Sequence, residues 1–95
     1  MYVSHREALR RYVLAHRAAG RTPEAIAADL EQIERSHAAT IAAYEVALAT
    51  FTAAPPAEEP WRQTRATAHQ GLRVELQRLR GLREDVESVL RGLHG

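Results

Sequence analysis

Cysteine is missing from the 95 residues of this chain. Its absence excludes disulfides, thiolate metal sites and cysteine nucleophiles, and it fits a reducing compartment. The first seven residues also lack the apolar core and the small-residue cleavage site of a secretory signal peptide. We therefore expect a cytoplasmic protein.

Long apolar runs are lacking as well. The segment that most resembles a membrane span is the alanine-rich run 38–54. It is too short to cross a bilayer, and Glu45 near its centre would be costly in lipid. The sequence thus predicts a soluble protein.

Lysine is also absent, so all thirteen basic residues are arginine. Residues 1–21 carry five Arg against one Glu, 22–60 carry one Arg against seven acids, and 61–95 carry seven Arg against four acids. The resulting charges of +4, −6 and +3 predict that the middle segment lies between the other two and partly neutralises both. The net charge of +1 gives no general argument for binding nucleic acid or a membrane surface.

Apolar residues recur at three- and four-residue spacings, which predicts three helices in one domain over 1–95. The first helix spans about 2–19. Thr22 and the proline after it form an N-cap and first-turn pair that begins a second helix over about 23–52. The unbroken apolar stripe of this second helix consists of Ile26, Leu30, Ile33, His37, Ile41, Tyr44, Leu48 and Phe51.

Three prolines in 53–60 predict a stiff, extended turn after the second helix. A third helix follows over about 61–93, with apolar residues at near-heptad spacing. The predicted fold is therefore all-α: a long antiparallel helical hairpin with a shorter N-terminal helix.

The first helix is too short to cover this hairpin. At 1.5 Å per residue, the second and third helices are about 45 to 50 Å long and the first is about 27 Å. If the first helix folds back along the second, two helices alone must enclose the far end of the stripe, and such apolar patches usually mark interfaces. We expect a homodimer with a four-helix arrangement, or a heterologous partner helix on the same surface. The predicted interface residues are Tyr44, Leu48, Phe51, Trp61 and Leu72.

His37 interrupts the apolar stripe, and Glu34 stands one turn before it. An i, i+3 pair of Glu and His is the unit that carboxylate-bridged metal sites use in helical bundles. Folding the first helix back brings His5 level with His37, so Glu34, His37 and His5 are candidate ligands for a divalent metal. We prefer a simpler interpretation, in which His37 is a core residue hydrogen-bonded to Gln77 or Tyr44 and no cofactor is needed.

Antiparallel pairing of the second and third helices also places His69 near Tyr44 and Glu45. Such a polar layer typically sets the register of helices. The sequence has no serine or threonine evidently placed beside a base, no glycine-rich phosphate loop and no HExxH motif. We therefore do not expect an enzyme.

The segment RAAGRTPEAIAADL at 17–30 resembles the first helix and turn of bacterial helix-turn-helix regulators, which implies DNA binding through a helix that follows it. Residues 31–35 depart from that pattern, because they lack the glycine turn and continue the apolar stripe. An arginine strip on the third helix is another candidate for contacting a phosphate backbone. Its members are Arg62, Arg65, Arg73 and Arg80, and pairing with acids of the second helix would explain them equally well.

Taken together, these patterns favour a non-enzymatic helical module for protein–protein interaction or assembly, which self-associates through the apolar stripes of its hairpin. A metal-binding bundle and a small DNA-associated protein are the alternatives.

Overall fold

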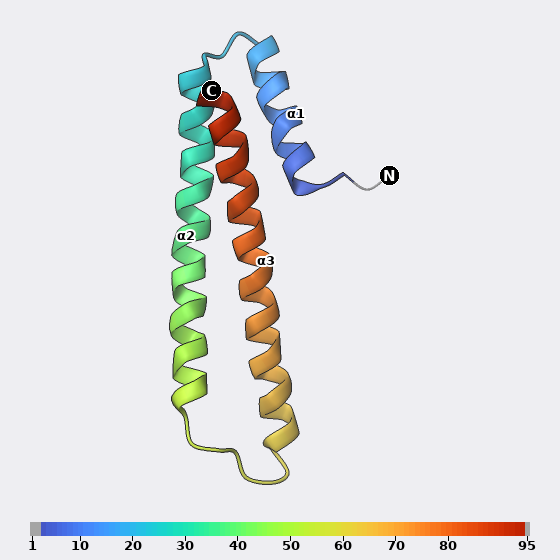
Figure 1. Ribbon diagram of the computed structural model, residues 1–95, viewed down its shortest axis with the longest axis vertical. Helices are drawn as coiled ribbons and strands as arrows, with labels where there is room; N and C mark the ends of the chain where they lie inside the picture. Colours follow the sequence, from blue (N-terminus) through green and yellow to red (C-terminus); the bar gives the residue numbers. More distant parts are fainter. Residues whose placement is uncertain (1–2, 95) are drawn as a thin grey trace.

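The computed structural model describes residues 3–94, and these residues contain three helices and no strand. They are α1 (His5–Ala18), α2 (Pro23–Ala53) and α3 (Arg62–His94). As Figure 1 shows, α2 and α3 form a long antiparallel hairpin, and α1 lies beside one half of it. This arrangement confirms the predicted all-α class and hairpin. Among the described residues, no helix combines the length and apolar character needed to cross a membrane.

The helix starts follow from local capping. The Ser4 hydroxyl accepts a hydrogen bond from the Glu7 amide at 3.1 Å and caps α1. The predicted start of this helix at residue 2 lies outside the described residues. Thr22 caps α2 in the same way, accepting from the Ala25 amide at 3.1 Å. The chain turns between the two helices at Gly20, whose φ of +90° suits glycine.

Helix α2 continues without interruption to Ala53. The turn that a helix-turn-helix motif would need after residue 30 is therefore absent from it. DNA recognition in the manner of such regulators has no structural basis in this helix.

The core has two parts. The upper part is built by all three helices, around a cluster of Leu9, Leu30, Val86 and Val89. The lower part is built by α2 and α3 alone, around Ile41, Leu76 and Leu79, with Tyr44 and Leu48 packed against it. The hairpin thus has a three-helix half and a two-helix half.

Helix α1 packs mainly against α3 and less against α2. In Figure 1, α1 lies on the α3 side of the hairpin, so the prediction that the acidic middle segment lies between the two basic ones is wrong. The physical reason lies in Asp85 of α3. Its carboxylate pairs with His5 at 3.2 Å and with Arg6 at 3.1 Å, and it draws the basic α1 towards α3.

The register of the hairpin also differs from the prediction. His69 lies beside Phe51 and Thr52, with its Nε2 atom 3.3 Å from the Thr52 hydroxyl, and not beside Tyr44 and Glu45. The linker after α2 is extended, so α3 begins below the end of α2 (Figure 1). This displaces the pairing by seven residues and removes the predicted polar layer.

Candidate functional site

The two broad sides of the hairpin differ in chemistry. We call the side that α1 occupies the α1 face. It is defined by the residues that α1 contacts: His37 lies with its ring centroid 6.2 Å from that of His5, and Asp29 accepts a hydrogen bond from Tyr12 at 2.5 Å. Asp85 marks the same face on α3.

We call the other side the ionic face, because ion pairs between α2 and α3 run along it. Arg83 binds Glu34 at 2.7 Å, Arg80 lies 3.8 Å from Glu45, and His94 lies 3.9 Å from Glu31. These pairs span both the upper and the lower half of the hairpin. Neighbouring acids and bases of the chain thus neutralise one another along this side.

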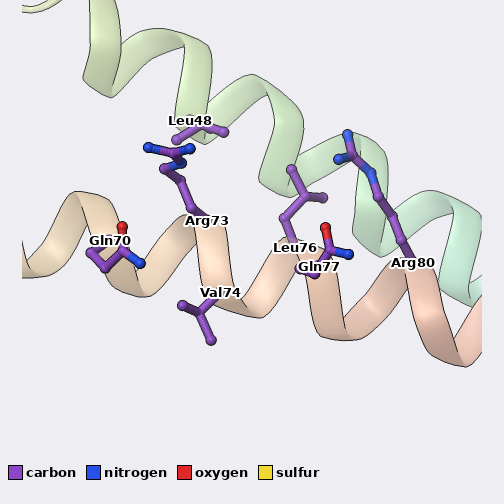
Figure 2. A pocket seen from close by; sticks show the side chains of 7 residues that line it. All are labelled: Leu48, Gln70, Arg73, Val74, Leu76, Gln77 and Arg80. Carbon is purple, nitrogen blue, oxygen red and sulfur yellow. The ribbon is translucent and has the colours of Figure 1, made fainter.

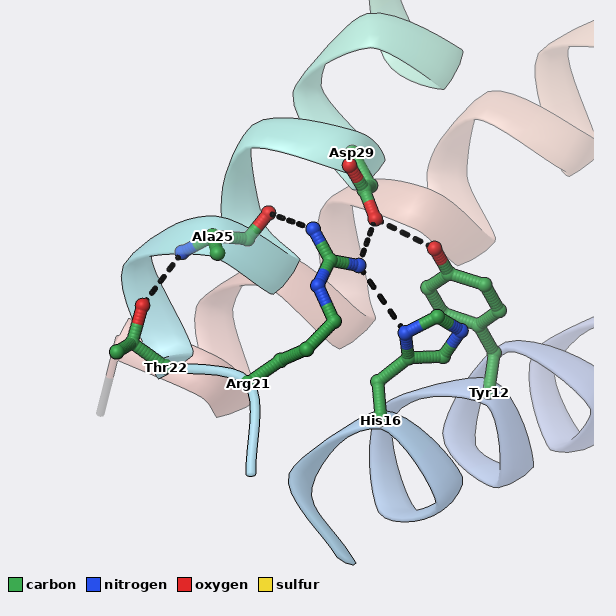
Figure 3. A network of polar contacts seen from close by, with 6 residues as sticks. All are labelled: Tyr12, His16, Arg21, Thr22, Ala25 and Asp29. Carbon is green, nitrogen blue, oxygen red and sulfur yellow. Dashed lines mark hydrogen bonds and ion pairs between the residues drawn. The ribbon is translucent and has the colours of Figure 1, made fainter. Parts of the chain in front are cut away.

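A polar network of four residues attaches α1 to the start of α2 (Figure 3). Arg21 and Tyr12 both donate hydrogen bonds to the carboxylate of Asp29, and Arg21 also donates to Nδ1 of His16 at 3.0 Å. The hydrogen bond from Arg21, and to a smaller extent the one from Tyr12, lower the pKa of Asp29 from 3.8 to about 2. The network fixes α1 over the upper half only.

The lower half of the α1 face is left without a covering helix. Helical periodicity carries this face from His37 to Tyr44 and Phe51, which follow at seven-residue steps. Both aromatic side chains are half-buried. The uncovered part of the hairpin therefore begins next to the N-terminal end of α1, where His5 lies beside His37.

The predicted interface residues all lie in this lower half. Tyr44 and Leu48 pack on the lower core cluster, and Leu72 is half-buried. Phe51 stacks on His69 with ring centroids 5.5 Å apart and an interplanar angle of 9°. Trp61 remains 66% exposed. No helix of the described chain encloses them.

Three further apolar side chains are exposed, and the sequence analysis did not single them out. Leu14 and Val46 are each 67% exposed and Val74 is 58% exposed. Val46 stands between the stripe positions Tyr44 and Leu48, where an exposed valine has no periodic signal of its own.

The four candidate arginines do not form one free strip. The guanidinium of Arg65 donates to three backbone carbonyls at the end of α2: those of Phe51 at 3.1 Å, Ala54 at 3.0 Å and Pro55. Arg62 pairs with Glu59 at 3.3 Å, and Arg80 pairs with Glu45.

Arg73 and Arg80 lie in a shallow, open groove of about 440 Å³ on α3 (Figure 2). Both side chains reach back towards α2, whereas Val74 points away from it. The groove is lined by Leu48, Gln70, Arg73, Val74, Leu76, Gln77 and Arg80. It offers two guanidinium groups at its rim, and DNA binding through them stays a prediction that a salt-dependent gel shift would test.

The candidate metal ligands lie near one another, but they do not share an interaction partner. His5 binds Asp85, and Glu34 binds Arg83. Nδ1 of His37 is buried without a hydrogen-bond partner, so the predicted hydrogen bond of this residue to Gln77 or Tyr44 is not found among the described residues. Burial, together with the positive charges of His5 and Arg78, lowers the pKa of His37. Within residues 3–94, no three His, Asp or Glu side chains gather closely enough to hold a metal ion. Metal binding stays a prediction that metal analysis of untagged protein would test.

No protein-family model, no curated protein and no solved structure matches this chain.

Proposed function

We propose that this protein is a non-enzymatic helical module that self-associates through the lower half of its hairpin. The observation that carries the proposal is the amount of surface that one chain exposes. A folded monomer of 10.6 kDa is expected to expose about 5,500 Å², because surface area scales with the 0.73 power of mass. This chain exposes 6747 Å², which is roughly 1,250 Å² more.

The excess surface arises from the shape of the chain. Its extents are 60 × 29 × 18 Å, so it is long and hardly thicker than two packed helices in its narrowest direction. The lower half contributes most to this, because two helices enclose less than three. Stable dimers bury about 800 Å² on each partner or more, and obligate ones bury above roughly 2,000 Å² in total. The excess on each chain is large enough for either class.

The exposed side chains support the same proposal. The lower half presents aromatic and aliphatic groups to solvent, including Trp61 at 66% exposure and Val46 at 67%. Large exposed apolar patches usually mark interaction surfaces. Closed two-fold assemblies are the commonest oligomers, and one of them would turn the two-helix half into a four-helix bundle.

Light scattering coupled to size-exclusion chromatography tests the proposal, with the purified full-length chain loaded over a range of micromolar concentrations. We expect a mass of twice 10.6 kDa at the upper end of the range. A mass of 10.6 kDa throughout would refute self-association.

A further inference from the structure

We infer that the second copy sits on the α1 face of the lower half, directly beyond the N-terminal end of α1, and not on the ionic face. This inference rests on the proposed self-association and adds which side of the hairpin is buried. In the dimer, the uncovered surface of each chain contacts the same surface of the second copy.

Charge is the first argument. From residue 36 to the end of α2 at Ala53, Glu45 is the sole Asp, Glu or Arg residue, and it belongs to the ionic face through its pair with Arg80. On α3, Glu75 and Arg78 pair with each other at 2.5 Å, so their charges are matched within the chain. A second copy on the α1 face would therefore desolvate one matched pair, whereas burial of the ionic face in the lower half would desolvate the Arg80–Glu45 pair together with Arg73, which pairs with no acid among the described residues.

Shape is the second argument. Small, exposed residues occur near the aromatic rings of Tyr44 and Phe51: Ala47 lies between them in α2, and Ala68 and Gly71 lie within two residues of His69, which stacks on Phe51. A Cβ atom added at Gly71 would meet nothing within 4 Å, so the space above this glycine is open. Small residues beside large ones let a facing helix approach closely and receive the large side chains in its own gaps.

Length is the third argument. Helix α1 has 14 residues and α2 has 31, which correspond to about 21 Å and about 46 Å. Roughly 25 Å of the α1 face is therefore uncovered. In a two-fold dimer, the lower half of each chain can occupy the uncovered space of its partner. The N-terminal end of each α1 then limits how far the partner can slide along the hairpin. The contact is self-complementary, as a two-fold interface requires.

Charge-insertion variants distinguish the two faces. Ala47→Glu and Gly71→Glu each place a carboxylate on the α1 face, where dimer formation would bury it without a partner. Ala49→Glu and Gln77→Glu are the matched controls, because they alter exposed positions of the same two helices on other sides. We expect Ala47→Glu and Gly71→Glu to have the monomer mass and both controls to have the dimer mass, with circular dichroism showing the same helix content for all four.

The outcomes separate this inference from the proposed function. A monomeric wild-type chain would refute the self-association itself. A dimeric wild-type chain whose mass is reduced by Ala49→Glu or Gln77→Glu, but not by Ala47→Glu or Gly71→Glu, would leave self-association intact and overturn the choice of face.

Thiol alkylation of single-cysteine variants tests the same choice of face if a glutamate variant fails to fold. The chain contains no cysteine, so Ala47→Cys and Ala49→Cys each introduce one reportable thiol. We expect alkylation of the thiol in Ala47→Cys to slow as protein concentration rises into the dimer range, and alkylation in Ala49→Cys to be unaffected. Equal, concentration-independent rates for the two would overturn the inference.

Discussion

Replacing Arg65 with methionine removes the group that closes the lower end of the hairpin while keeping an apolar side chain of similar length. The lost guanidinium donates three hydrogen bonds to carbonyls at the end of α2 and lies 5.2 Å from the centroid of the Phe51 ring. Each hydrogen bond contributes about 0.5–1.5 kcal/mol, and we take the low end because these acceptors lie at or near the surface. With about 0.5 kcal/mol for the cation–π contact, the loss is about 2 kcal/mol.

The assay is thermal unfolding of Arg65→Met and wild type at one fixed protein concentration. For a chain of this size, a loss of about 2 kcal/mol corresponds to a midpoint lower by about 10 °C. The matched control is Arg62→Met, which loses a single ion pair to Glu59 in which both side chains are 70% exposed. That pair contributes about 0.5 kcal/mol or less. Equal midpoints for Arg65→Met and Arg62→Met would refute the conclusion that the hydrogen bonds of Arg65 stabilise the end of α2.

Three further predictions follow from burial, titration and backbone preference. Leu30 is fully buried, so Leu30→Ala should lower the free energy of unfolding by about 3 kcal/mol in urea denaturation, whereas Leu14→Ala at a 67% exposed site should change it by less than about 0.5 kcal/mol. Because burial lowers the pKa of His37, the unfolded chain binds its proton more readily. Stability should be full above pH 6.5 and fall as the pH drops through the folded-state pKa, and His37→Leu should reduce this fall; an unchanged pH profile would contradict it. Gly81 is exposed within α3 and a Cβ atom there meets nothing within 4 Å, so Gly81→Ala should raise the free energy of unfolding by about 1 kcal/mol, and a decrease would show an unrecognised contact.

The helices could be predicted because their signals are local. The Thr22 cap and the stripe from Ile26 to Phe51 involve residues close in sequence. Helix α2 accordingly ends at Ala53, one residue beyond the predicted end. The register of the hairpin could not be predicted, because it depends on the path of the linker. An extended linker lowers the start of α3, and His69 then meets Thr52 instead of Tyr44.

The surroundings of the candidate site were predictable only in part. The short turn at Gly20 brings His5 level with His37, and this could be inferred by counting residues from the turn. The engagement of Glu34 by Arg83 depends on a helix 49 residues away, whose rotation the sequence does not specify. The acceptors of Arg65 are backbone carbonyls, which carry no signature in the sequence.

The concentration dependence of thermal unfolding tests most directly whether a second copy completes this fold. When unfolding is coupled to dissociation, mass action raises the midpoint as the protein concentration increases. We predict that the midpoint of the wild-type chain rises steadily from low to high micromolar concentration, and that the midpoint of Ala47→Glu does not. A wild-type midpoint that stays constant over this range would contradict the account.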